Sequence, residues 1–109
     1  MVNYKTGCFI PHRIHILKIQ DQFMTDIIDG VKTFELRYND RDYKAGDFIH
    51  FVKVNGEEFA MTDNLYVITY VLKDVPEYGL RTNYCILSIR RSNIYKFLKE
   101  VPNEERDDL

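Results

Sequence analysis

The sequence predicts an α+β fold, in which five to six strands form a small β-barrel with one main helix and a short C-terminal helix. Segments rich in Val, Ile, Thr and Tyr recur along the chain and are typical of strands. One early segment has apolar residues at helical spacing. An Asn-Gly pair at positions 55 and 56 lies between two apolar segments and is the strongest hairpin signal in the chain.

The first strand is predicted at residues 13–19, after an irregular N-terminal arm, residues 1–12, that contains a glycine and a proline. The two-residue alternation of apolar side chains breaks after Ile16. Two arrangements fit this pattern. Either Lys18 shares a face with Ile16, or a β-bulge turns the far end of the strand over.

A short amphipathic helix is predicted next, about two to three turns long. Asp21 is its expected N-cap and Gly30 its C-terminal stop. Its apolar stripe is expected to cover one end of the sheet and consists of Phe23, Met24, Ile27 and Ile28. Lys32 follows the end of the helix and is expected at the start of the next strand, where a cleft can form.

The remaining elements follow a polar crossing at residues 39–46. A strand at 47–54 is predicted to turn back through Asn55-Gly56 in a type I′ turn, because both residues accept the positive φ that this turn requires. Residues 57–61 are expected to pair with it. Two further strands are predicted at 65–72 and 83–90, joined by a loop at 74–82 that has room for one helical turn. Ser92 is the expected cap of the terminal helix, 92–100.

Length and charge limit the function classes. The 109 residues suit one domain, predicted at 13–100, with an acidic tail at 101–109. The net charge is −2, of which the tail carries −3, leaving +1 for residues 1–100. This balance excludes a protein that coats duplex nucleic acid through bulk electrostatics, so any nucleic-acid contact should be local.

Cysteine and histidine usage indicates a reduced, cytoplasmic protein without a metal site or cofactor. Cys8 and Cys85 are too far apart in sequence for a CxxC motif, and Cys85 reads as core filling. His12, His15 and His50 lack the spacing of a metal site, and His15 is interpreted as an ordinary strand histidine. No apolar stretch approaches the length of a membrane span.

Residues 30–37, Gly-Val-Lys-Thr-Phe-Glu-Leu-Arg, are the most informative segment. A strand alternates its faces, so Glu35 and Arg37 should share one face while Phe34 and Leu36 enter the core. Lys32 adds a second cation at the start of the strand. From the residues alone, an intramolecular ion pair on a half-exposed strand and a ligand-facing site both stay open, and the ion pair is the commoner arrangement.

This segment fits the pattern Gly-x-Lys-x-x-Glu-x-Arg and resembles the ASCH family of PUA-like domains. The similarity extends over roughly residues 12–91, and four further segments look like a bacterial and phage subgroup without an assigned function: 15–19, 39–42, 45–47 and 76–80. The resemblance implies a small β-barrel associated with RNA binding. In some members it implies enzymatic attack on nucleic acids or modified nucleosides.

The leading hypothesis is a module that binds single-stranded RNA or a nucleotide. Lys32 and Arg37 would engage phosphate or base, and Glu35 would accept from a base or ribose. Arg41, in the polar crossing, is expected to project toward solvent or ligand. Tyr78 is expected to offer a free ring from the 74–80 loop, which would form the cleft together with residues 30–37 and the helix.

Two alternatives stay open. One is an amidohydrolase or ribonuclease in which Lys32 and Glu35 are the catalytic acid/base pair. In one ASCH-like enzyme type, a Lys at the position of Lys32 acts with a Thr at the position of Glu35, so this chain departs from that pattern. The other is a protein-interaction module whose acidic tail contacts a partner.

Overall fold

The computed structural model describes residues 13–92. The predicted N-terminal arm, the terminal helix beyond Ser92, the acidic tail and Cys8 lie outside the described residues. The elements are β1 (Ile14–Gln20), α1 (Asp21–Ile28), β2 (Phe34–Tyr38), β3 (Phe48–Asn55), β4 (Glu58–Leu72), the 3₁₀ turn η1 (Pro76–Tyr78) and β5 (Tyr84–Arg91).

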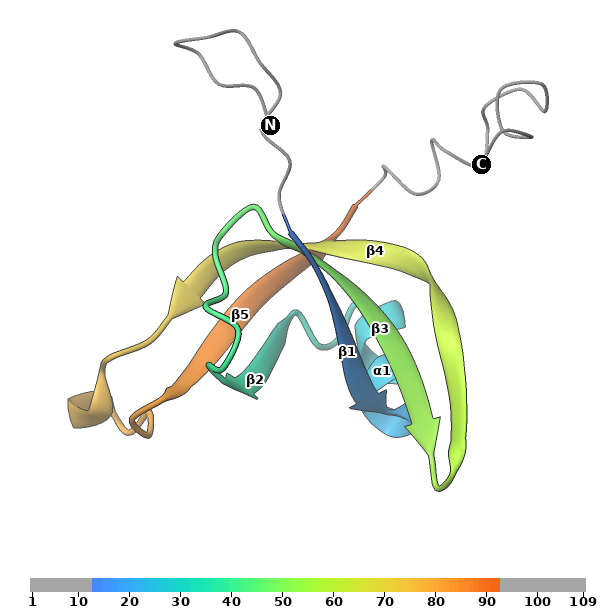
Figure 1. The fold of residues 1–109 in the computed structure, drawn as a ribbon, viewed down its shortest axis with the longest axis horizontal. Helices are drawn as coiled ribbons and strands as arrows, with labels where there is room; N and C mark the ends of the chain where they lie inside the picture. Colours follow the sequence, from blue (N-terminus) through green and yellow to red (C-terminus); the bar gives the residue numbers. More distant parts are fainter. Residues whose placement is uncertain (1–12, 93–109) are drawn as a thin grey trace, which may run out of the picture.

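The strands form one five-stranded mixed sheet in the order β1-β3-β4-β5-β2 (Figure 1). β1 and β3 run parallel, and the other neighbours are antiparallel. The sheet bends into a half-barrel in which β1 and β2 are the two edge strands. The predicted barrel-like α+β fold is therefore confirmed in outline, but no backbone ladder between β1 and β2 closes the barrel within residues 13–92.

β1 alternates its faces without a bulge. His15, Leu17 and Ile19 are buried, whereas Ile14, Ile16, Lys18 and Gln20 are exposed. Of the two arrangements that fit the sequence, Lys18 sharing a face with Ile16 is the one observed. The broken apolar pattern has a simple cause, because the buried position at the start of β1 is filled by a histidine and the exposed one by an isoleucine.

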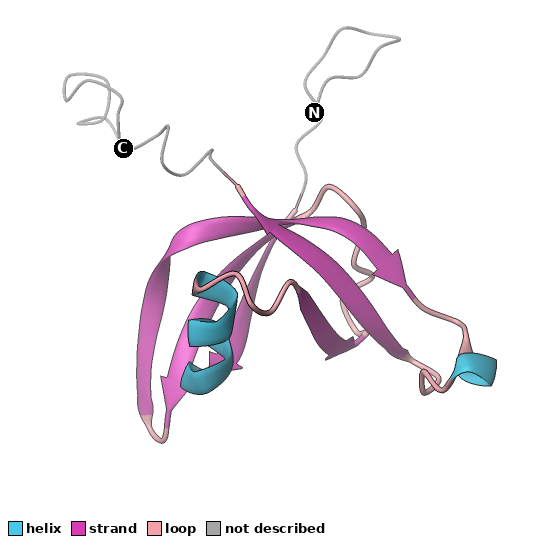
Figure 2. Ribbon diagram, turned by 180° about the vertical axis from the view of Figure 1, so that it is seen from behind, coloured by secondary structure: helices cyan, strands magenta, loops and turns pink. Residues whose placement is uncertain are grey.

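α1 packs on β1 and β3 inside the bend of the sheet (Figure 2). Met24 and Ile27 are buried, while Phe23 and Ile28 lie on the flanks of the helix and stay partly exposed. The predicted N-cap was wrong by one residue, because Gln20 holds the cap position with an extended backbone and no side-chain capping bond.

β4 is one continuous strand of 15 residues, and the predicted division at residues 62–64 was wrong. The ladder between β3 and β4 instead changes register there, with one residue of β3, Phe51, opposite three of β4, residues 62–64. Thr62 Oγ1 donates to Phe51 O over 2.9 Å, and His50 Nε2 donates to Thr62 O over 2.7 Å. The polar residues thus mark a bulge at which β4 bends around the barrel, not a break.

The hairpin between β3 and β4 lies where the Asn-Gly signal predicted it, but its turn differs. Asn55 pairs with Glu58, so the loop residues are Gly56 and Glu57. Gly56 has a φ of +62°, and Glu57 is not among the residues with positive φ. Positive φ at the first loop residue alone is the pattern of a type II′ turn, so the type I′ prediction was wrong.

The core lies between the sheet and α1. Its buried residues are Leu17, Ile19, Met24, Ile27, Tyr43, Ile49, Phe51, Tyr66, Ile68, Cys85, Leu87 and Ile89. Cys85 is fully buried, as predicted, and burial raises the pKa of its thiol, which favours the unreactive protonated form. Within residues 13–92, no helix is long and apolar enough to span a bilayer.

Candidate functional site

β2 presents its charged residues inward, opposite to the predicted orientation. Glu35 is only 5% exposed, whereas Phe34 and Leu36 are 47% and 56% exposed. The cause is the ladder with β5, where Glu35 pairs with Leu87 and Arg37 with Cys85. Directly paired residues of antiparallel strands point to the same side, and Leu87 and Cys85 belong to the core. The prediction that Phe34 and Leu36 enter the core was therefore wrong.

The Glu35 carboxylate binds two cations. Lys32 Nζ donates to Oε1, Arg37 Nε donates to Oε2 over 2.9 Å, and Arg37 Nη2 forms an ion pair with Oε2 at 2.7 Å. The Lys32 and Arg37 side chains are themselves only 17% and 22% exposed. The two cations satisfy the oxygens of the buried carboxylate. Together Lys32, Glu35 and Arg37, here called the triad, carry a net charge of about +1.

Further contacts hold the two cations in place. Lys32 Nζ donates to Phe34 O over 2.7 Å and lies above the Phe34 ring, 5.0 Å from its centroid. The Phe23 ring of α1 is 5.8 Å from the same ammonium. These contacts fix a lysine that would otherwise sample many rotamers.

Two arginines bridge the open side of the half-barrel. Arg37 Nη2 donates to Lys18 O over 2.7 Å, and Arg41 Nη1 donates to Ile16 O over 3.0 Å. Both acceptors are backbone carbonyls of β1, the edge strand opposite β2. The guanidinium groups thus occupy the place where a closed barrel would have a backbone ladder.

The triad opens into a hollow of about 520 Å³ between β1, α1 and β2, here called the first hollow. Its wall includes three cationic side chains, Lys18, Lys32 and Arg37, and three aromatic rings, Phe23, Phe34 and Tyr38. The volume lies within the range of about 300–1,000 Å³ that small-molecule sites occupy. The structure therefore brings Lys32, Glu35 and Arg37 together beside a concave surface, as predicted.

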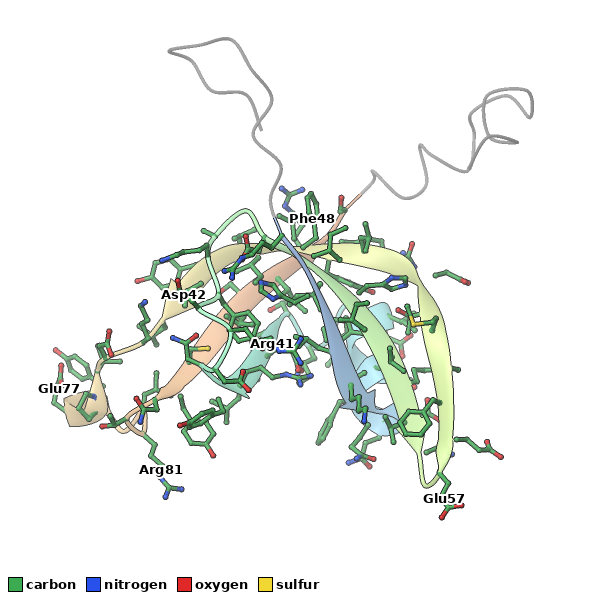
Figure 3. All side chains as sticks on the ribbon, viewed as in Figure 1. Arg41, Asp42, Phe48, Glu57, Glu77 and Arg81 are labelled. Carbon is green, nitrogen blue, oxygen red and sulfur yellow. The ribbon has the colours of Figure 1, made fainter. Side chains whose placement is uncertain are left out.

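Arg41 and Tyr78 do not line the first hollow. Arg41 instead lies near the middle of the molecule in Figure 3, where its guanidinium donates to a backbone carbonyl of β1. Tyr78 lies on η1 and is 84% exposed. The tip of the sheet that carries Glu77 and Arg81 is far from α1 (Figure 3). The prediction that the 74–80 loop helps to form the cleft was wrong.

A second polar cluster, around Asp47, was not predicted. Asp47 is 3% exposed and accepts hydrogen bonds from His15 Nε2 at 2.8 Å, Arg13 Nη2 at 3.2 Å and Lys44 N at 3.1 Å. Arg13 also donates to Arg41 O over 3.0 Å. This cluster ties the polar crossing that carries Arg41 to the start of β1.

The electrostatics of this cluster favour an ionised carboxylate. Burial alone would raise the pKa of Asp47, but the hydrogen bonds from His15 and Lys44 N and the charge of Arg13 outweigh it and hold the pKa below its usual value. The Tyr43 ring packs edge-on against His15 at 4.7 Å between centroids. Burial raises the pKa of the Tyr43 phenol, although the charges of Arg41 and Arg37 oppose that change.

In the described part of the chain, no three His, Cys, Asp or Glu side chains gather where they could hold a metal ion. A search of curated proteins finds no match to this chain. Residues 14–89, from the start of β1 nearly to the end of β5, match the family described as a domain of unknown function, DUF3850. This span is more than half of the sequence, and the chain therefore belongs to the DUF3850 family.

Proposed function

We propose that this DUF3850 domain binds single-stranded RNA or a nucleotide in the first hollow. The observation that carries the proposal is the Lys32–Glu35–Arg37 triad, in which one buried carboxylate orients two cations beside a hollow with aromatic walls. A net positive site suits phosphate, and exposed rings suit bases. The binding is local, in agreement with the small net charge of the chain.

Arg37 has donors left for a ligand. Its Nε and Nη2 groups bond to Glu35 and Lys18 O, and no residue among 13–92 accepts from Nη1. Phe34 and Tyr38 keep about half of their surface exposed at the wall of the hollow. If the phosphate of a nucleotide bound to Arg37 and Lys32, its base would lie within reach of these two rings, because one sugar joins the phosphate to the base.

The same geometry favours binding over hydrolysis. A general base needs a carboxylate oxygen free to take a proton from water or substrate. Both oxygens of Glu35 already accept from Lys32 or Arg37. Glu35 is thus better suited to orienting the cations than to abstracting a proton.

The resemblance to ASCH and other PUA-like domains supports the proposal. A bent five-stranded sheet with one main helix suits that fold, and the Gly30, Lys32, Glu35 and Arg37 pattern lies within the matched residues 14–89. We propose that DUF3850 is related to this group and that the domain works in the reduced environment of the cytoplasm.

Arg37→Ala should weaken the binding of short single-stranded RNA. Losing a charge-assisted hydrogen bond costs about 1.5–3 kcal/mol, which corresponds to at least about tenfold weaker binding. Filter binding of RNA oligomers at low and moderate salt measures the effect. Arg81→Ala is the matched control, because Arg81 lies at the far end of the sheet (Figure 3) and should leave binding unchanged.

Arg37→Lys separates charge from geometry, since it keeps the cation but loses the planar fork. It should bind less tightly than the wild type and more tightly than Arg37→Ala. Wild type and Arg37→Ala that bind equally weakly, with both proteins folded by circular dichroism, would contradict the proposal. A panel of acylated nucleosides and RNA substrates checks for turnover, and turnover that Glu35→Gln abolishes would favour the hydrolase instead.

A further inference from the structure

A second, smaller hollow adjoins the triad at Lys32. It has a volume of about 200 Å³ and lies between the end of α1, the approach to β2 and the end of β5. Its polar wall residues are Lys32, Thr33, Tyr66, Arg90 and Arg91. Lys32 therefore lines both hollows.

The charge of this second hollow is positive. Lys32 is paired with Glu35, but neither Arg90 nor Arg91 forms an ion pair or side-chain hydrogen bond with any residue in the described range 13–92. None of the side chains that line it is acidic. Adjacent cations without counter-charges in a concave site attract an anion.

Tyr66 provides an independent indication of a polar ligand. Its side chain is 3% exposed, and its hydroxyl is buried without a hydrogen-bond partner. Buried hydroxyl groups are nearly always hydrogen-bonded, so an orphan one points to a missing partner. Tyr66 lines the second hollow and also a third hollow of about 260 Å³, so the missing acceptor belongs to one of these two.

Building on the proposed function, we infer that the ligand is an oligonucleotide of at least two phosphates, one bound at each side of Lys32. The first hollow has the volume of a small-molecule site, whereas the second is below that range and suits a phosphate group. Lys32 is shared by the two hollows, so consecutive phosphates of one strand can reach both. A mononucleotide would fill the first hollow only.

The test compares uridine 5′-monophosphate with 5′-phosphorylated uridylate oligomers of two, four and eight nucleotides. Affinity should rise between the monomer and the short oligomers. Arg91→Gln should remove most of that gain while leaving the affinity for the monophosphate unchanged. It should also lower the slope of log affinity against log salt by about 0.7, the value for one lost phosphate contact on a single strand.

Arg81→Gln is the matched control, because it removes the same charge at a residue that lines neither hollow and lies at the end of the sheet far from α1 (Figure 3). Arg91→Gln that weakens monomer and oligomer equally, or neither, would overturn the inference while binding that depends on Arg37 would still uphold the proposed function. Equal competition by hexaglutamate and the uridylate tetramer would also overturn it, since the hollow would then be a general anion site. Failure of the wild type to bind any probe would overturn both proposals.

Discussion

Glu35→Gln should destabilise the domain by about 3 kcal/mol, near the lower end of the range for breaking a buried ion pair. The glutamine amide has one acceptor oxygen in place of two, and its NH₂ group faces Lys32 or Arg37, which are themselves donors. Two cations would be left close together without a counter-charge. Both keep some contact with solvent, which is why the lower end of the range applies.

Urea unfolding measures this loss as a shift of the midpoint at constant slope. Asp21→Asn is the matched control, because Asp21 forms an ion pair with Lys53 at 3.7 Å in which both side chains are about half exposed. That change should cost at most about 1 kcal/mol. In the double variant Lys32→Met/Glu35→Gln, stability should recover in part, because one of the unpaired cations is gone. A Glu35→Gln effect no larger than that of Asp21→Asn would mean that the triad is an ordinary surface ion pair.

Strand alternation correctly predicts which side chains of β2 share a face, but it does not predict which face is buried. Glu35 and Arg37 lie together and so do Phe34 and Leu36, as expected. The usual preference for burying Phe and Leu gave the wrong side. The register with Leu87 and Cys85 of β5 decides the orientation, and register between strands far apart in sequence is not encoded in local periodicity.

Other differences have the same origin in tertiary contacts. The polar residues at 62–64 indicated a break, yet Thr62 stays in β4 because its hydroxyl and carbonyl bond to β3. The sequence predicts an ordinary strand residue at His15, because a separation of 32 residues from Asp47 hides their contact. The helix stop at Gly30, the place of the hairpin at Gly56, the helix and the strand positions were predictable because they depend on local backbone preferences.

Asp47→Asn should destabilise the domain at pH 6 by about 1.5–3 kcal/mol, the usual contribution of hydrogen bonds to a charged group. Asp47 Oδ2 accepts from His15, Arg13 and the Lys44 N–H, and an asparagine offers these three donors a neutral oxygen, so the hydrogen bonds lose their charge assistance. His15 is 5% exposed, so water cannot compensate for its weakened hydrogen bond. The free energy of unfolding from urea titrations at pH 6 measures the difference between the two proteins.

The difference in unfolding free energy between wild type and Asp47→Asn should shrink in acid, because the pKa of Asp47 is lowered in the native state. A carboxyl group whose pKa is lower in the native state stabilises the fold above its unfolded pKa, here 3.8, and that contribution is lost as the pH falls through the native value. The gap between wild type and Asp47→Asn should therefore be constant from pH 6 to about pH 5 and narrow below pH 4. Asp42→Asn is the control, because Asp42 is 65% exposed and 3.4 Å from Lys44, so it should change stability by no more than about 1 kcal/mol. A gap that stays constant down to pH 3 would show that the carboxylate charge of Asp47 does not stabilise the link between the polar crossing and β1.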